Sequence, residues 1–323
     1  MKDYFYITSK DEVINRYDGA DKKRTVIDEN GEPYLLKLPS KANHNNEVSY
    51  SNNVFSEYIG CHIYETLEID AQKTYLGIFQ NNDNIEKYAC ACKDFTSEQW
   101  KLIEFQKLSN SYDNDYLNIR GGSTELKDIE EVLSNHYQIN DKIKLKNLFW
   151  DMFIVDGLIG NFDRHNGNWG ILVNTRTNEI KNAPVYDCGS CLFSQLTDEQ
   201  MVRILNSQEQ INIRIYDRPL SAIKINDKKI NYYTFINSLE NKECNDALLR
   251  IMPKINMDRI CLIIDNAPYI SEIRKHFYKT ILSKRYEKIL MPAYEKIKGR
   301  CLDYKENNRD FNIEDNLDDI PDI

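Results

Sequence analysis

The sequence predicts an α+β fold with two lobes, a β-rich lobe over residues 1–95 and a helical lobe over residues 96–307. Strand-like runs and an Asn-Gly turn occur before residue 95, whereas helical spacing of apolar residues dominates after it. A chain of 323 residues is long enough for each lobe to bury its own core. The acidic tail over residues 308–323 is expected to lie outside both lobes.

Within the N-terminal lobe, residues 25–38 are expected to form a β-hairpin. Asn30-Gly31 separates two strand-like runs there, and this dipeptide is a strong hairpin signal. The Asn-rich stretch 40–53 is expected to be a polar loop. Apolar spacing indicates one helix and two further strands, at 54–66, 74–79 and 88–92.

The C-terminal lobe is centred on an apolar segment, residues 145–159, within a predicted helix over 142–160. Its apolar side chains are dense enough for a helix buried on nearly every side. A polar loop follows, and then a short apolar strand at 169–173. Apolar spacing indicates further helices near 97–109, 124–137, 197–207, 231–238, 243–251, 256–265 and 270–305.

The loop after the buried helix carries Asp163 and Asn168, which are five positions apart. This spacing is typical of the protein-kinase catalytic loop, where the Asp orients the attacking hydroxyl and the Asn holds a magnesium ion. Asn, Asp and Gly also form ordinary helix-ending turns, so the loop alone leaves that alternative open.

Three more charged residues favour the kinase interpretation. Strand alternation places Lys37 on the face opposite its two leucine neighbours. Lys37 or Glu57 alone would be an ordinary surface charge, but together they match the strand lysine and helix glutamate that position ATP phosphates in kinases. Asp187 lies at a strand end, where kinases place a metal-binding Asp. The five residues occur in the kinase order, so we expect a bilobal protein-kinase-like fold.

The chain also resembles the HipA-like serine/threonine kinases, whose catalytic loop reads Asn-x-Asp-x-His with a downstream Asn. Residues 161–168, Asn-Phe-Asp-Arg-His-Asn-Gly-Asn, fit that motif. The similarity covers most of residues 15–290 and is greatest to the small stand-alone members of the cell-translocating type. It is carried by the segments FSEYIGCHI, CKDF, FWDMF, GNFDRHNGNWG, YDCGSC and NDALLRI.

The resemblance implies a role for each candidate residue. Asp163 would be the catalytic base, and Lys37, paired with Glu57, would contact the phosphates of ATP. Asn168 and Asp187 would bind magnesium. The remaining nucleotide contacts would come from a phosphate-covering segment and from the hinge backbone, at Gly19, Ala20, Ala91, Cys92 and Lys93.

Two further groups of residues have alternative interpretations. His165 is a candidate catalytic proton carrier, but we favour a structural role in which its ring nitrogens brace the loop. Cys188-Gly-Ser-Cys191 and Cys90-Ala-Cys92 fit a zinc or redox site, but buried packing is preferred because no second Cys-x-x-Cys occurs.

The composition limits the partners and the location. A net charge of −9 argues against a nucleic-acid partner bound through its phosphates. No apolar run approaches the roughly 18 residues of a membrane span, and the N-terminus lacks the apolar core of a secretory signal. The eight scattered cysteines suggest reduced thiols. We therefore expect a cytoplasmic protein without a membrane partner, and secretion as an effector stays open.

The expected reaction is transfer of the ATP γ-phosphoryl group to a protein Ser or Thr, with autophosphorylation in the N-terminal lobe. Candidate sites are Thr25, Ser40, Ser49 and Ser51. A regulatory or antitoxin-like partner is a further expectation from the resemblance. HipA-type toxins have an inhibitory serine where this chain has Arg16, so that form of self-inhibition is not expected.

Two alternatives remain at this point. One is a nucleotide-binding pseudokinase that acts as an interaction module. The other is a metal-dependent phosphohydrolase using Asp163, His165 and Asp187, although five scattered histidines make a dinuclear site a weaker interpretation.

Overall fold

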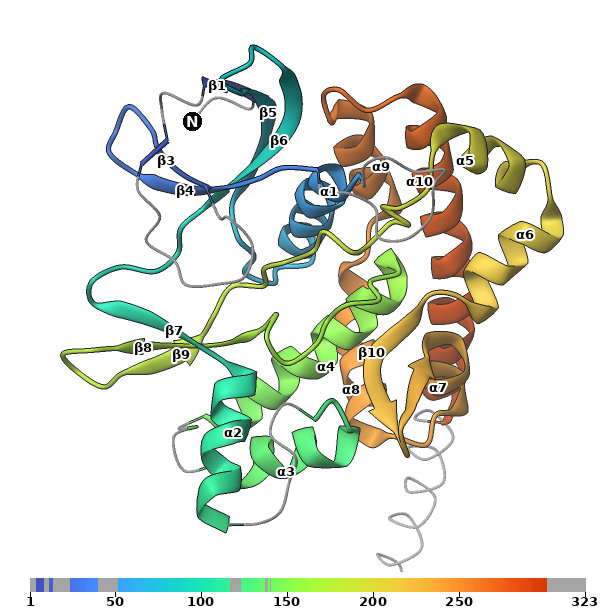
Figure 1. Ribbon diagram of the computed structural model, residues 1–323. Helices are drawn as coiled ribbons and strands as arrows, with labels where there is room; N and C mark the ends of the chain where they lie inside the picture. The colour runs from blue at the N-terminus through green and yellow to red at the C-terminus, as the bar shows by residue number, and fades with distance from the viewer. Residues whose placement is uncertain are drawn as a thin grey trace, which may run out of the picture.

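The computed structural model describes residues 4–8, 12–13, 24–39, 52–116, 123–136, 139 and 141–300. Its N-terminal part is built on a six-stranded sheet with the strand order β1-β5-β6-β4-β3-β2 (Figure 1). Strand β1 runs parallel to β5, and the other pairings are antiparallel. The strands are β1 (Tyr4–Thr8), β2 (Glu12–Val13), β3 (Arg24–Ile27), β4 (Pro33–Lys37), β5 (Thr74–Gln80) and β6 (Glu86–Lys93).

The predicted hairpin is confirmed as β3 and β4, with a longer turn than two residues. Ile27 pairs with Pro33, so five residues connect the strands. The Asp28 carboxylate accepts hydrogen bonds from the backbone N–H groups of Asn30 and Glu32, both at 2.9 Å. Gly31 has a φ of +81°, a conformation that glycine adopts at little cost.

The two faces of this sheet pack against different partners. Leu36 and Ala91, which pair across β4 and β6, belong to a small cluster on one face. Lys37 pairs with Cys90, and Cys90 belongs to the main core together with helix α1 (Asn53–Thr66). Because alternate residues face opposite sides of a strand, Lys37 points toward α1.

The helical part surrounds α4 (Lys142–Ile159), which lies centrally in Figure 1. The Asp141 carboxylate caps its N-terminus by accepting from the Lys144 N–H at 2.9 Å, and Gly160 ends it in the left-handed conformation with a φ of +66°. Residues 152–159 are all buried, as the apolar pattern predicts. The surrounding helices are α2 (Phe105–Tyr116), α3 (Leu126–Asn135), α5 (Asp198–Leu205), α6 (Gln208–Asn212), η2 (Ile213–Asp217), α7 (Tyr232–Ser238), α8 (Lys242–Ile251), η3 (Met252–Lys254), α9 (Met257–Asn266), α10 (Glu272–Arg285) and η4 (Tyr286–Leu290).

Two smaller sheets contain strands that the sequence did not predict, while β8 (Gly170–Asn174) confirms the strand predicted at 169–173. The helix predicted near 97–109 begins only at residue 105, because β7 (Trp100–Glu104) pairs with β8, which in turn pairs with β9 (Ile180–Asn182). Strands β10 (Leu220–Ile225) and β11 (Lys228–Asn231) form a hairpin that the apolar spacing did not indicate. The long C-terminal helix changes to a π-helical turn at η4 and continues over 291–300.

None of the helices in the described part of the chain has the length and apolar character needed to cross a membrane.

Candidate active site

Lys37 lies between two carboxylates at the end of β4. Its Nζ is 2.9 Å from Glu57 Oε2 and 2.9 Å from Asp187 Oδ1. The Glu57 side chain is fully buried, that of Lys37 is 22% exposed and that of Asp187 is 46% exposed. Burial lowers the pKa of Lys37, but the charges of Asp187 and Glu57 outweigh it and hold the pKa well above its usual value. Lys37 is therefore a fixed cation between α1 and the segment after β9.

Helix α1 is packed closely against that segment. A Cβ at Gly60 would lie 2.7 Å from the Cys188 Cβ and 3.1 Å from the Cys191 Sγ. The Ser56 hydroxyl donates to the Cys191 carbonyl oxygen at 2.8 Å. These contacts bring the helix face that carries Glu57 against the segment that carries Asp187.

The catalytic-loop candidate, residues 160–168, is held by hydrogen bonds of its own. Asn161 Oδ1 accepts from the Asp163 N–H at 3.1 Å. The Asp163 carbonyl oxygen accepts from the His165 N–H at 2.8 Å and from Asn168 Nδ2 at 2.9 Å. The backbone of Asp163 is thus fixed from both sides, and its carboxylate makes none of these bonds.

The two aspartates have opposite pKa shifts. Burial raises the pKa of Asp163, and the negative charge of Asp187 adds to this, while His165 acts in the opposite direction. The charge of Lys37 lowers the pKa of Asp187, and this outweighs burial. Asp163 therefore resembles a general base, and Asp187 a carboxylate that stays ionised.

His165 makes the kind of contact expected of a bracing residue. Its Nδ1 accepts a hydrogen bond from the Gly167 N–H at 3.0 Å, which closes a tight turn within the loop. This contact fixes the ring orientation and leaves Nε2 as the nitrogen that carries the proton in the neutral ring.

Asn168 and Asp187 offer oxygen atoms that fit magnesium. Because Asn168 Nδ2 donates to the Asp163 carbonyl, the amide oxygen is the atom available to a cation. Magnesium prefers oxygen ligands and commonly takes one or two carboxylates together with nucleotide phosphates. No group of three or more His, Cys, Asp or Glu in the described residues could hold a metal ion by itself. One amide oxygen and one carboxylate leave most of the magnesium shell to phosphate oxygens and water, so this donor set fits a metal that arrives with a nucleotide.

The three predicted hinge residues lie in β6. Ala91 pairs with both Leu36 of β4 and Tyr75 of β5, so it is inside the sheet. Cys92 is similarly placed between β4 and β5, and the Lys93 carbonyl accepts from Gln72 Nε2 at 3.0 Å. The predicted phosphate-covering residues Gly19 and Ala20 lie outside the described residues.

The cysteines confirm the packing interpretation. Cys90, Cys92, Cys188 and Cys191 are free and fully buried.

Thr25, a candidate phosphorylation site, is also buried, at 1% exposure within β3. Ser40, Ser49 and Ser51 lie outside the described residues.

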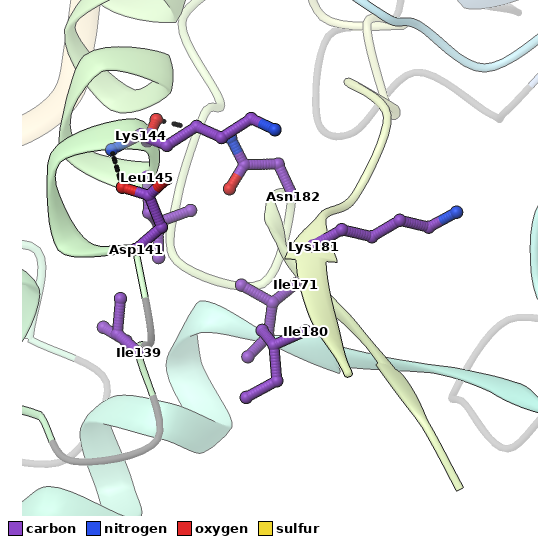
Figure 2. A pocket seen from close by; sticks show the side chains of 8 residues that line it. All are labelled: Ile139, Asp141, Lys144, Leu145, Ile171, Ile180, Lys181 and Asn182. Atoms are coloured by element: carbon purple, nitrogen blue, oxygen red, sulfur yellow. Dashed lines mark hydrogen bonds between the residues drawn. The ribbon is translucent and has the colours of Figure 1, made fainter. Parts of the chain in front are cut away.

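A separate cavity lies between the start of α4 and strands β8 and β9, and it contains none of the predicted site residues. Its volume is about 90 Å³, well below the roughly 300 Å³ at which ligand pockets begin. Figure 2 shows Ile171 and Ile180 lining it, while the Lys181 side chain points away. This cavity is too small for a nucleotide.

Sequence reasoning did not assign a functional role to Asp156, near the end of α4, or to Arg164, within the catalytic loop, and these two side chains form a buried ion pair. Asp156 accepts hydrogen bonds from the Tyr64 hydroxyl at 2.8 Å and from Asn161 Nδ2 at 3.0 Å. A carboxylate in the otherwise apolar stretch 152–159 of α4 was the available signal, because an unpaired buried charge would be costly.

Comparison with known proteins assigns the chain to a family. The HipA-like C-terminal domain matches residues 16–255. The chain belongs to the HipA-like family. It is 43% identical over 305 residues to the serine/threonine-protein kinase CtkA of Helicobacter pylori, covering 94% of this chain and 91% of that protein. This relationship makes the chain a serine/threonine protein kinase.

Solved structures agree with the kinase-like fold. The crystal structure of the Helicobacter pylori proinflammatory kinase CtkA superposes with a TM-score of 0.78 at 42% identity, covering 86% of this chain and 95% of that chain. HipA of Shewanella oneidensis, solved in a complex with HipB and operator DNA, superposes with a TM-score of 0.52 at 13% identity, covering 87% and 67% of the two chains. At that identity the second match shows the fold alone.

Proposed function

We propose that this kinase transfers the γ-phosphoryl group of ATP, with magnesium, to a Ser or Thr hydroxyl of a protein substrate. The observation that carries the proposal is the position of the Lys37 Nζ, 2.9 Å from both Glu57 and Asp187. That arrangement joins the phosphate-binding and metal-binding groups of a kinase. We place the nucleotide between a lobe formed by residues 1–95 and a lobe formed by residues 96–307, with residues 308–323 as a tail.

In this proposal Lys37 contacts the α- and β-phosphates. The lysine ammonium is a compact charge on a flexible stem, so it needs a partner that fixes its direction. Glu57 supplies that partner from a fully buried position on α1. The Lys37 Nζ then meets the phosphates without losing its contact with the helix.

Asp163 orients the attacking hydroxyl and accepts its proton at a carboxylate oxygen. Its raised pKa suits a group that must take up a proton during the reaction. The Asp163 N–H donates to Asn161 Oδ1, and the Asp163 carbonyl accepts from the His165 N–H and from Asn168 Nδ2; these bonds to its backbone keep the carboxylate in place. Most of the rate enhancement would come from such positioning and from charge neutralisation.

Asn168 and Asp187 would hold magnesium through their side-chain oxygens. When bound, magnesium neutralises charge on the phosphate oxygens. The lowered pKa of Asp187 keeps this ligand ionised over the working pH range. Magnesium rather than another divalent cation is part of the proposal.

The adenine contact is proposed at the Lys93 end of the segment from Ala91 to Lys93. The backbone of Ala91 and Cys92 lies within the sheet, whereas Lys93 is the last residue of β6. Asp94 follows, and its N–H donates to the Pro33 carbonyl at 2.9 Å, which fixes the start of the connection to the helical part. Gly19 and Ala20 are proposed to cover the phosphates.

The proposal extends to the partner and the location. A protein kinase requires a protein substrate, and the resemblance to HipA-type kinases supports a regulatory protein of the antitoxin kind. The net charge of −9 supports the expectation that the chain itself does not grip nucleic acid. We also propose a cytoplasmic location.

Incubation with γ-labelled ATP, magnesium and a generic protein substrate tests the proposal. Label on a protein Ser or Thr, lost in Asp163→Asn, supports it. Release of free phosphate without labelled protein would indicate a phosphohydrolase. ATP binding without either product would indicate a pseudokinase.

A further inference from the structure

Arg164 is a buried arginine whose hydrogen bonds join three separate segments of the site. It is 3% exposed, and its Nε donates to Asp156 Oδ2 at 3.0 Å. One of its terminal nitrogens, Nη1, donates to the Asn168 carbonyl at 2.9 Å and also to the Tyr186 carbonyl. The other, Nη2, contacts the Cys188 Sγ at 3.4 Å. The guanidinium therefore touches α4, the catalytic loop and both neighbours of Asp187.

This arrangement bears directly on the two candidate magnesium ligands. The Asn168 carbonyl belongs to one ligand, and the Tyr186 and Cys188 contacts lie on either side of the other. Because one planar group binds all of them, the separation of Asn168 and Asp187 depends on where the guanidinium sits. An ammonium group lacks the planar fork needed to reach these acceptors together.

Asp156 fixes the guanidinium in turn. The carboxylate is 1% exposed, and its Oδ1 accepts from Tyr64 on α1 at 2.8 Å and from Asn161 Nδ2 at 3.0 Å. Burial lowers the pKa of Arg164, but the charge of Asp156 outweighs it and holds the pKa well above the usual value. The same carboxylate thus connects helix α1, the start of the catalytic loop and Arg164.

We propose that Arg164, held by Asp156, is a positioning residue that sets the separation of Asn168 and Asp187 and so determines the magnesium affinity of the nucleotide complex. The inference rests on the proposed function, because it takes Asn168 and Asp187 as the metal ligands. A purely structural ion pair would instead contribute to stability without any specific effect on the metal.

The test compares Arg164→Lys with a control that perturbs a similar arginine elsewhere. Arg274 is 4% exposed and donates to Asp198 Oδ1 at 2.8 Å and to the Leu196 carbonyl at 2.9 Å, between α10 and the start of α5. Both substitutions keep the positive charge but replace the planar guanidinium, with its several N–H donors, by an ammonium group. ATP affinity is measured calorimetrically at a series of magnesium concentrations, and thermal unfolding is measured for each variant.

We expect Arg164→Lys to raise the magnesium concentration for half-maximal enhancement of ATP binding by about 10-fold or more, the usual scale for losing a residue that orients metal ligands. Arg274→Lys should lower thermal stability but leave the magnesium dependence unchanged. An unchanged magnesium dependence in a folded Arg164→Lys protein would overturn the inference.

Tyr64→Phe provides a milder variant if Arg164→Lys does not fold. It removes one donor to Asp156 and should shift the magnesium requirement in the same direction by a smaller factor. An unchanged requirement would then overturn the inference. If wild-type protein bound ATP with no magnesium effect, the metal site of the proposed function would be contradicted, and this inference with it.

Discussion

The Lys37 Nζ and the Asp187 Oδ1 lie 2.9 Å apart although the residues are separated by 150 positions in the chain. The same nitrogen is 2.9 Å from Glu57 on α1. This single lysine thus joins the sheet, the helix packed on it and the segment that carries the candidate metal ligand. Stability and catalysis are both expected to depend on it, and the two effects are separable.

Lys37→Met should destabilise the protein as well as abolish ATP use. Glu57 is fully buried, so losing its partner leaves an uncompensated charge, which typically costs about 3–5 kcal/mol. Urea unfolding measures the loss. Adding Glu57→Gln to the same chain should recover much of the stability but none of the activity.

Lys73→Met is the matched control for that loss. Lys73 also pairs with a glutamate of α1, Glu65, but the lysine side chain is 59% exposed. An exposed pair of this kind contributes within about 1 kcal/mol. If Lys37→Met and Lys73→Met had equally small effects on unfolding, Glu57 would not depend on Lys37.

Gly60→Ala should loosen α1 from the segment that follows Asp187. The added Cβ would lie 2.7 Å from the Cys188 Cβ, so one of the two segments must move. Overpacking of this kind costs about 1–3 kcal/mol, and we also expect weaker ATP use because Glu57 is on the same helix. Gly299→Ala, where nothing lies within 4 Å, should stabilise slightly. Equal unfolding midpoints for the two variants would contradict the close contact.

The acid side of the pH–rate profile should report Asp163. Its raised pKa places protonation above the ordinary aspartate value of about 3.9. Asp187, with a lowered pKa, stays ionised there. We expect kcat/KM to fall with decreasing pH while circular dichroism still shows folded protein. A rate loss that coincides with unfolding would contradict the assignment.

The same shift predicts how Asp163→Asn changes stability with pH. A carboxyl whose pKa is raised on folding binds its proton more tightly in the folded state, so its ionisation destabilises the fold at neutral pH. Asp163→Asn should therefore unfold at a slightly higher temperature than wild type at pH 7. The gain should shrink as the pH falls through the raised pKa, because wild-type Asp163 is then protonated. A thermal unfolding series between pH 4 and pH 7 measures it, and a gain that grows toward low pH would contradict the sign of the shift.

Autophosphorylation, if it occurs in the N-terminal lobe, should spare Thr25. Thr25 is 1% exposed within β3, so its hydroxyl cannot reach an active site without local unfolding. We expect phosphate on Ser40, Ser49 or Ser51, as mapped by mass spectrometry after incubation with MgATP. Thr25 as the main site would contradict this.

The pairing of Lys37 with Glu57 was predictable from the kinase pattern of a strand lysine and a helix glutamate, whereas strand alternation indicated only the face on which Lys37 lies. Strand β7 was not predictable in this way, since Trp100–Glu104 is extended only through its pairing with β8, some 70 positions later in the sequence. Likewise, the family resemblance assigned Ala91 and Cys92 to the hinge. Their position between β4 and β5 depends on long-range strand register, which local sequence patterns do not indicate.

Arg164 shows a further limit of sequence reasoning. Two of its acceptors are the backbone carbonyls of Asn168 and Tyr186. Every residue has a backbone carbonyl, so the residue types in the sequence do not indicate these contacts. Asp156 was recognisable as a charged residue in the apolar stretch 152–159, but its partners become evident only when α1, α4 and the loop are packed together.

The most direct test of the central claim is to compare ATP affinity, with and without magnesium, and single-turnover transfer in Asp163→Asn and Asp187→Asn. Asp163→Asn should keep its magnesium-dependent ATP affinity, whereas transfer should fall by roughly 10²–10⁴-fold, the scale for losing a positioned acid–base group. Asp187→Asn should lose both magnesium-dependent affinity and transfer, because it removes charge from a hard-cation site. Loss of magnesium-dependent binding in Asp163→Asn alone would reverse the two roles, and undiminished transfer in both variants would contradict the kinase mechanism.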